Sequence, residues 1–386
     1  MYYFIKIWVR AGLLFFCRKI VISNRNVLNE RGPLLLACNH PNSFFDAVLL
    51  GALFKNPVHF LARGDAFKNP IAKKILTTLK AIPIYRLSEG KEYLALNDTA
   101  FEQCNQILQD GGIVLIFSEG LCLNQWQLRP LKKGSARIAM NAWKQEAILK
   151  AFRVLPVSLN YNSFTKFGKK IIIEFGEPIV SSEACIAANE AQQIRHFNKL
   201  LYSRLKQGIL MDENTSVVQF LLSNTALLKD SSKPVSYLKN LKAKLTSDIL
   251  KKDLYNLSNT KSLSLNTISF VNNLLLSVLL FIPALTGVLI HLPVYLPLKN
   301  FIKNKTKGTV FYDSTLFAAL LIVYPFYVLL LAVLCSILIN PIGLLLVIAV
   351  PFFALIYLYW KDCFVSTINY LKMKKNERKA LQALLQ

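Results

Sequence analysis

The hydrophobic and polar positions divide the chain into an alternating part and an apolar part. From residue 23 to about 212, short apolar or β-branched runs alternate with amphipathic helical patterns. This alternation is typical of an α/β fold, a central sheet flanked by helices, in which ligands bind at the carboxyl ends of the strands. The expected strands are 34–38, 58–61, 82–85, 113–117, 154–159 and 170–175, and the expected helices are 44–54, 70–80, 92–109, 134–147 and 182–207.

The apolar part contains a long uncharged run. No Asp, Glu, Lys or Arg occurs from Ser314 to Trp360, which are 47 residues. One helix of this length would measure about 70 Å, over twice the roughly 30 Å thickness of a hydrocarbon core. We therefore expect a C-terminal α-helical membrane region with a transmembrane hairpin over 314–360. The predicted turn is Asn340-Pro341-Ile342-Gly343.

A second apolar stretch, 274–298, is interrupted by Pro283 and Gly287. We predict that it enters and leaves the membrane on one face, turning between these two residues; a single span is the alternative. Cations near the membrane favour the cytoplasmic side, and both flanks of the hairpin carry them. The α/β part is thus expected on the cytoplasmic face of a cell membrane. The flanking cations are Lys299, Lys303, Lys305, Lys307, Lys361, Lys372, Lys374, Lys375, Arg378 and Lys379.

The remaining segments complete the expected domain organisation. Residues 1–22 are apolar and aromatic but carry four cations, which favours an interfacial helix over a signal peptide; an ordinary buried helix is the alternative. The predicted domains are the interfacial helix 1–22, the α/β domain 23–212, a helical connector 213–265, the membrane region 266–362 and a basic cytoplasmic tail 363–386.

Composition narrows the class of partner. Hydrophobic residues make up 53% of the 386 residues, and the formal net charge is +24. A basic chain attracts phosphate, and long uncharged runs favour an anionic membrane over nucleic acid. The seven cysteines are odd in number and show no paired spacing, which argues against a disulfide framework or a zinc site.

The first candidate site is the segment Asn39-His-Pro-Asn-Ser-Phe-Phe-Asp46. Pro41 disfavours a helical conformation at His40, so His40 is expected on a loop after a strand. Ser43 is expected to cap the next helix, with Asp46 in its first turn. A carboxylate near Nδ1 fixes the tautomer and leaves Nε2 as a general base. The alternative is that Ser43 and Asp46 form a capping box without chemistry.

Two further clusters follow strands, and a third precedes a helix. Arg86 closes the run Ala81-Ile-Pro-Ile-Tyr-Arg86 and suits a phosphate, although a surface arginine is the alternative. Glu119 and Gly120 follow the strand 113–117; the glycine permits close backbone approach, and the carboxylate can accept substrate hydroxyls. Cations next to a helix start suit a phosphate, or form an ordinary solvated loop. These cations are Arg129, Lys132 and Lys133.

The segments NHPNSFFD, IPIYR, FSEG and VLPV, in this order, resemble the four sequence blocks of the glycerol-3-phosphate and lysophosphatidate acyltransferases. The resemblance covers residues 34 to about 180. It implies catalytic roles for His40 and Asp46. It also implies glycerol phosphate binding by Arg86, Glu119 and Gly120. The departures are five residues between His and Asp where four are usual, Ser118 in place of Pro, and Leu121-Cys122 in place of Thr-Arg.

The resemblance implies direct acyl transfer from acyl-CoA or acyl carrier protein to a glycerophospholipid acceptor, without a metal, a bound cofactor or a covalent intermediate. Lysophosphatidate is the first expectation for the acceptor, and glycerol 3-phosphate or another lyso-lipid is the alternative. Two alternative functions come from other classes of protein. One is a hydrolase that uses the His–Asp pair, and the other is a noncatalytic lipid-binding scaffold. The oligomeric state has no signal in the sequence.

Overall fold

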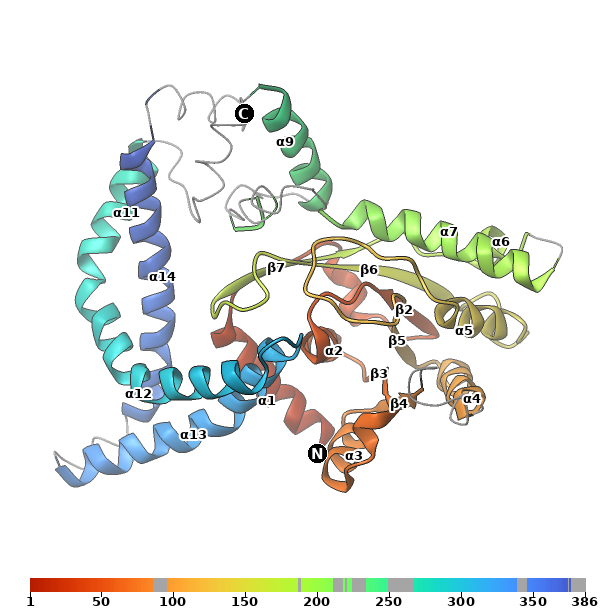
Figure 1. Cartoon of the computed structure of the whole chain (residues 1–386), viewed down its shortest axis with the longest axis horizontal. Helices are drawn as coiled ribbons and strands as arrows, with labels where there is room; N and C mark the ends of the chain where they lie inside the picture. Colours follow the sequence, from red (N-terminus) through yellow and green to blue (C-terminus); the bar gives the residue numbers. More distant parts are fainter. Residues whose placement is uncertain are drawn as a thin grey trace. The chain divides into compact units, whose positions relative to one another are not determined.

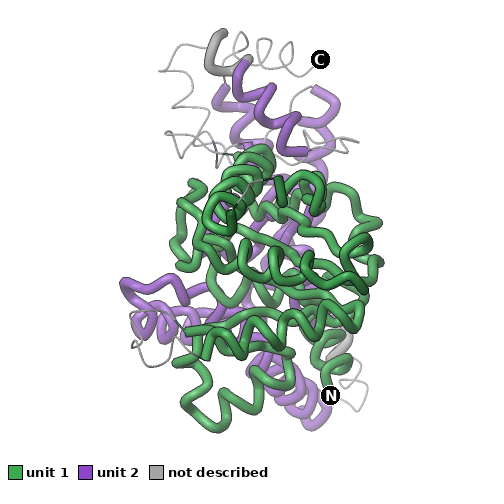
Figure 2. The backbone as a smooth tube through the Cα atoms, turned by 90° about the vertical axis from the view of Figure 1, so that its right-hand side faces the viewer, with its two compact units in different colours: residues 1–10, 22–160, 172–211 green, residues 11–21, 161–171, 212–386 purple. Residues whose placement is uncertain are grey.

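The computed structural model describes residues 1–85, 96–186, 189–210, 218, 221–223, 234–248, 267–338, 346–373 and 375. The chain divides into two compact units, shown in different colours in Figure 2. Unit 1 contains residues 1–10, 22–160 and 172–211, and unit 2 contains residues 11–21, 161–171 and 212–386. Each unit is described separately below.

A seven-stranded sheet carries the α/β part, with the strand order β1-β7-β6-β2-β5-β3-β4 (Figure 1). The strands from β6 to β4 in this order are parallel to their neighbours, so their carboxyl ends share one edge. The prediction of an α/β fold with a central sheet flanked by helices is confirmed. The strands are β1 (Cys17–Ile22), β2 (Leu34–Cys38), β3 (Val58–Arg63), β4 (Ala81–Ile84), β5 (Ile113–Phe117), β6 (Arg153–Tyr161) and β7 (Lys169–Phe175).

Helices cover both faces of the sheet. The alternating residues Leu35 and Ala37 of β2 belong to a buried cluster with α4 (Leu96–Gln109), α5 (Gly134–Trp143) and α7 (Glu190–Gly208). Residues one position away along β2 point to the opposite face, because successive side chains of a strand alternate. Helix α2 (Ser43–Leu53) contributes further buried side chains there, and α3 (Pro70–Thr78) and α6 (Ser181–Ala184) complete the helices.

The N-terminal helix is shorter than predicted. Helix α1 spans Tyr2–Phe16, and residues 17–22 form strand β1 instead of continuing the helix. Two physical reasons explain the correction: the segment ends in the β-branched run Ile-Val-Ile, and β7 offers it a neighbouring strand in the sheet. The apolar content of residues 1–22 did not distinguish one continuous helix from a helix followed by a strand.

Two cations of α1 bind backbone carbonyls at the end of α2 and just after it, within unit 1. The last carbonyls of a helix have no partner inside it. Lys6 Nζ donates to the carbonyl of Lys55 at 3.1 Å, and Arg10 Nε donates to the carbonyl of Ala52 at 2.5 Å. A further bond runs from Arg10 to the Phe54 carbonyl at 3.1 Å. These contacts hold the far end of the helix whose first turn carries Asp46.

Four apolar helices form most of the described C-terminal part, and α9 (Pro234–Asp248) lies in the predicted connector. The helices are α11 (Thr267–Leu279), α12 (Phe281–Lys305), α13 (Tyr312–Leu338) and α14 (Leu346–Lys372). Three segments are long and apolar enough to cross a membrane, Phe281–Lys305, Tyr312–Leu338 and Ala349–Lys372. Membrane association, as predicted, follows from these helices. The predicted turn at 340–343 lies outside the described residues.

The predicted turn between Pro283 and Gly287 is wrong. The chain changes direction at Leu280, where α11 ends and α12 begins, and α12 continues through both residues (Figure 1). Pro283 is the third residue of α12, a position whose backbone N–H has no partner in a helix. Gly287 instead permits close packing, since a Cβ there would lie 2.4 Å from the carbonyl oxygen of Phe353 in α14. Whether α12 spans or re-enters stays a prediction.

Ion pairs in unit 2 bring the two ends of the uncharged run together. Asp313, just before the run, pairs with Lys169, and both side chains are fully buried. Asp362, just after the run, accepts a bond from Arg18 at 2.9 Å and lies 3.9 Å from Lys170. Because Lys169 and Lys170 are adjacent residues, their two partners, Asp313 before the uncharged run and Asp362 after it, must lie near each other. This agrees with a transmembrane hairpin whose two ends lie on the same side of the membrane.

Accessibility labelling tests the membrane topology. Single cysteines at positions 303, 340 and 374, in a background without the seven native cysteines, are probed with an impermeant thiol reagent on intact cells. We expect only position 340 to be labelled, because each cation near an anionic leaflet is worth about 1 kcal/mol and both flanks carry several. Labelling at position 303 would show that the segment 274–298 crosses the membrane.

Candidate active site

The loop between β2 and α2 brings His40 and Asp46 together. The His40 Nδ1 atom lies 2.9 Å from Asp46 Oδ2, and the side chains are 15% and 0% exposed. On one continuous helix, six residues of separation would point the two side chains apart. The contact forms because the helix begins only at Ser43, where φ is +51°. The two predicted catalytic residues therefore share one site.

The helix cap differs from the prediction. Asn42, and not Ser43, is the N-cap residue, and no side-chain hydrogen bond caps the helix there. Asp46 Oδ2 accepts the backbone N–H of Asn42 at 2.8 Å, in addition to its contact with His40. The same oxygen thus satisfies a helix-start amide and orients the imidazole. The capping and the catalytic interpretations of Asp46 are both compatible with this geometry.

Neighbouring strands fix the position of His40. The imidazole stacks on the ring of Phe117 at the end of β5, with ring centroids 3.8 Å apart and an interplanar angle of 12°. The preceding residue, Asn39, exchanges two hydrogen bonds with Leu159 of β6, at 2.8 and 3.1 Å. The roles of Phe117 and Asn39 were not predicted. The sequence indicates only that each of these two residues stands at or next to the end of a strand.

Glu119 joins this site through its two carboxylate oxygens. Oε1 accepts the backbone N–H of His40 at 3.3 Å, and Oε2 accepts Arg129 Nε at 2.6 Å. Burial raises the pKa of Glu119, against the lowering effect of the Arg129 charge. The predicted role of Glu119 as an acceptor of substrate hydroxyls stays a prediction. In the structure, the Glu119 carboxylate connects the His40 loop to Arg129 through these two hydrogen bonds.

Gly120 and Lys132 lie beside Glu119. Gly120 has φ +68°, and a Cβ there would lie 2.8 Å from Lys132 Cγ. A side chain at this position would therefore be strained and would collide with Lys132. The backbone N–H of Lys132 donates to the carbonyl of Ser118 at 2.8 Å, which ties the basic segment to the end of β5. Lys132 itself is exposed, while the Arg129 side chain is only 18% exposed.

Cys122 stands next to the start of α2 and was not predicted as a site residue. Its Sγ accepts the backbone N–H of Ser43 at 2.9 Å. Burial raises the pKa of the Cys122 thiol to about 12. The thiol is therefore protonated near neutral pH and is a poor nucleophile. A covalent step at this sulfur is therefore disfavoured.

Arg86, predicted to bind phosphate, lies outside the described residues. The described part of this segment ends at Tyr85, whose backbone exchanges two hydrogen bonds with Asn97, at 2.8 and 2.9 Å. The structure therefore brings together His40, Asp46, Glu119, Gly120, Arg129 and Lys132, and leaves the role of Arg86 as a prediction.

The sequence matches a known family over the domain that carries this site. Residues 19–160 match the model of the Acyltransferase family. This part of the chain is an acyltransferase domain. This match, and the relatives below, support the glycerolipid acyltransferase family that the four motifs resemble.

Two curated proteins are similar to the chain. Glycerol-3-phosphate O-acyltransferase 2 of Saccharomyces cerevisiae is 34% identical over 84 residues, which are 22% of this chain and 11% of the yeast protein. The 1-acyl-sn-glycerol-3-phosphate acyltransferase BAT2, chloroplastic, of Brassica napus is 22% identical over 195 residues. That match covers 48% of this chain and 52% of the Brassica protein. The chain thus spans about half or less of these relatives.

A solved structure is also similar, the crystal structure of the 1-acyl-sn-glycerophosphate (LPA) acyltransferase PlsC from Thermotoga maritima. The two chains are 19% identical, with a TM-score of 0.39. The match covers 53% of this chain and 77% of the Thermotoga chain.

Proposed function

We propose that this acyltransferase transfers a fatty acyl group from a thioester donor to the free hydroxyl of lysophosphatidate. The observation that carries the proposal is the 2.9 Å contact between His40 Nδ1 and the buried Asp46 carboxylate, on a loop at the carboxyl edge of the sheet. A carboxylate in this position selects the tautomer whose Nε2 can accept a proton.

The proposed reaction has two linked events. His40 Nε2 takes the proton of the acceptor hydroxyl while that oxygen attacks the thioester carbonyl. The carbon–sulfur bond then breaks, the thiolate leaves and takes up the proton from His40, and the ester remains on the acceptor. General-base catalysis contributes roughly 10²- to 10⁴-fold, and positioning of the two substrates supplies much of the remaining acceleration.

Lysophosphatidate is the proposed acceptor because the chain carries apolar helices suited to a membrane, where this lipid already resides. Arg129, held by Glu119 beside His40, supplies a positive charge for the acceptor phosphate. Glycerol 3-phosphate is the second candidate, since the yeast relative is named for that acceptor and the Brassica relative for the acylated one. The proposed donor is acyl-CoA or acyl carrier protein, approaching from the cytoplasmic face.

Release of free thiol tests the proposal. The purified chain in detergent receives acyl-CoA alone, then acyl-CoA with lysophosphatidate or with glycerol 3-phosphate, and the thiol is titrated with a chromogenic disulfide. We expect release only with an acceptor, and fastest with lysophosphatidate. Release without any acceptor would indicate a hydrolase, and faster release with glycerol 3-phosphate would change the assignment of the acceptor.

Replacement of Arg86 by lysine is expected to raise the KM for the phosphorylated acceptor and to leave the KM for the donor nearly unchanged. The guanidinium offers paired donors that fit a phosphate, whereas lysine offers a point charge. Loss of one bidentate, charge-assisted contact corresponds to roughly 10-fold or more in KM. Steady-state kinetics with each substrate varied in turn measures the effect. Equal weakening for both substrates would assign Arg86 to the donor or to general structure.

A further inference from the structure

A second surface of unit 1, on helix α3, has the chemistry of a lipid contact. No Asp or Glu occurs from Ala66 to Ser88, while four lysines do. Within α3, Ile71 is 72% exposed and Ile75 is 53% exposed. These isoleucines are four residues apart and therefore lie on one side of the helix. Such exposed β-branched side chains among cations require an explanation. The lysines are Lys68, Lys73, Lys74 and Lys80.

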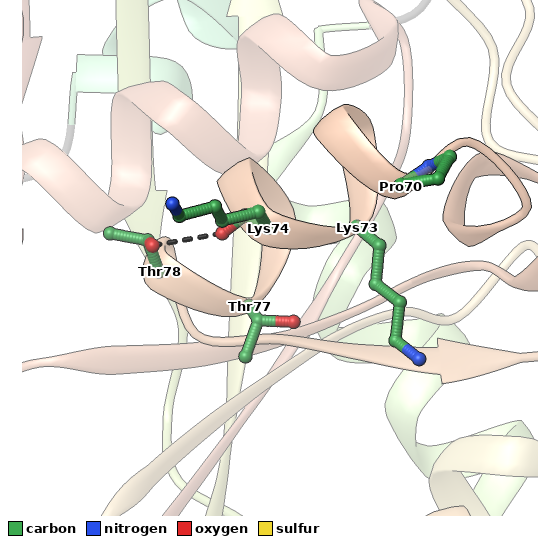
Figure 3. Close-up of a pocket in the computed structure, with 5 residues that line it drawn as sticks. All are labelled: Pro70, Lys73, Lys74, Thr77 and Thr78. Atoms are coloured by element: carbon green, nitrogen blue, oxygen red, sulfur yellow. Dashed lines mark hydrogen bonds between the residues drawn. The ribbon is translucent and has the colours of Figure 1, made fainter.

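The polar side of the same helix lines a hollow of 420 Å³, whose residues are shown in Figure 3. Two lysines and two threonines are among its lining residues, and their ammonium and hydroxyl groups are donors that suit the oxygens of a phosphate. Thr78 donates its Oγ1 hydrogen bond to the Lys74 carbonyl at 2.8 Å (Figure 3). None of these residues belongs to the site around His40. The lining residues are Pro70, Lys73, Lys74, Thr77 and Thr78.

The apolar and polar sides adjoin on α3. At 100° per residue, positions 73, 77, 70, 74, 78, 71 and 75 follow one another around the helix. The outward surface therefore changes from lysine and threonine to isoleucine, and the buried Leu76 lies on the opposite side. An amphipathic surface with cations next to the apolar edge is typical of segments that lie at a membrane interface. We call the exposed side chains of residues 70–78 the α3 surface.

We propose that the α3 surface binds a bilayer containing anionic phospholipid, with Ile71 and Ile75 in the acyl boundary and headgroup phosphates at the lysine-rich side of the helix. Charge complementarity supports an anionic bilayer as the ligand, because the segment from Ala66 to Ser88 carries lysines and no Asp or Glu. Each lysine near an anionic leaflet changes local partitioning by about fivefold. The inference is independent of which acceptor the enzyme uses.

A bilayer fits unit 1 better than an acidic protein does. Helix α1 also exposes large apolar side chains in the same unit. Both segments adjoin β3: Tyr2 of α1 hydrogen-bonds the backbone of Val58, and Lys80, two residues after α3, accepts from the Phe60 N–H at 3.2 Å. A fluid bilayer accommodates two such apolar groups without shape complementarity. The exposed side chains of α1 in this unit are Met1, Tyr3, Phe4, Ile7 and Trp8.

The position of α3 relates this contact to the acyltransferase site. Helix α3 follows β3 after the short η2 turn (Gly64–Phe67), so its first residues emerge from the carboxyl end of β3. Strands β3, β5 and β2 are parallel, and His40 follows the same end of β2. The α3 surface therefore begins at the sheet edge that carries the reacting groups. A headgroup contact there would hold this edge against the lipid.

Site-specific fluorescence in the full chain tests the proposal. In a background without native cysteines, Ile71→Cys or Ile75→Cys carries an environment-sensitive dye, and Gln103→Cys, exposed on α4, is the matched control. The chain is reconstituted into phosphatidylcholine vesicles with or without phosphatidylglycerol, each with spin-labelled lipid as a quencher. We expect a blue shift and quenching at 71 and 75 only with phosphatidylglycerol, and neither at 103.

Charge reversal supplies the second measurement. Lys73→Glu with Lys74→Glu is expected to remove most of the quenching at position 75, while the matched pair Lys144→Glu with Lys150→Glu leaves it unchanged. Both pairs consist of exposed lysines, and thermal melting verifies the fold of each variant. A dye at 75 that stays in water in all vesicles would overturn the proposal. So would a blue shift that requires added acyl carrier protein and shows no lipid quenching. These readouts do not depend on turnover.

Discussion

Replacement of His40 by alanine is expected to abolish acyl transfer while the protein still inserts into the membrane. In the proposed mechanism the imidazole acts as a base at Nε2, and its ring stacks on Phe117 at the surface of the site, 15% exposed. Loss of the base lowers turnover by roughly 10²- to 10⁴-fold, and misplacement of the acceptor adds to this. Initial rates of ester formation with radiolabelled donor measure the change.

The control for this prediction is His196→Ala on α7, whose Nε2 contacts the Glu183 carbonyl at 2.9 Å and which lies outside the described site. It is expected to retain transfer. Membrane recovery and melting temperature of both variants report folding. Near-normal turnover of His40→Ala would show that the His–Asp pair is not the base, and the proposed mechanism would fail with it.

Replacement of Asp46 by asparagine is expected to reduce transfer nearly as much as the loss of His40. Asp46 Oδ2 accepts from both His40 and the backbone N–H of Asn42. The amide keeps the size of the side chain but loses the charge that stabilises the imidazolium. If its nitrogen faces His40, it also favours the wrong tautomer. The lost helix-start interaction alone costs only about 1 kcal/mol of unfolding free energy.

Turnover and melting temperature, measured on the same preparation, separate the two roles of Asp46. The matched control is Asp98→Asn, an exposed acid in the first turn of α4, which shares the helix-start position but no contact with a histidine among the described residues. We expect the control to affect stability slightly and turnover not at all. A lower melting temperature with intact turnover in Asp46→Asn would leave only the capping role.

The periodic part of the fold could be predicted from the sequence, because β-branched runs and amphipathic spacing act locally. The strands expected at 34–38 and 113–117 have those bounds in the structure, and the other predicted strands differ from it by one or two residues at either end. Strand β1 was missed, since its neighbour β7 is more than a hundred residues away in the chain. Pairing partners at that distance leave little trace in a local pattern.

The sequence alone predicted the class of the protein: the order of four strand-end motifs, the His40–Asp46 spacing and a 47-residue uncharged run indicate an acyltransferase domain in a membrane-associated chain. The tertiary structure decided which groups meet. Parallel strands bring Glu119 and Phe117 to His40, and the fold pairs Arg129 with Glu119 and Lys169 with Asp313. Most of these contacts join residues that are distant along the chain, and their geometry depends on strand register and burial.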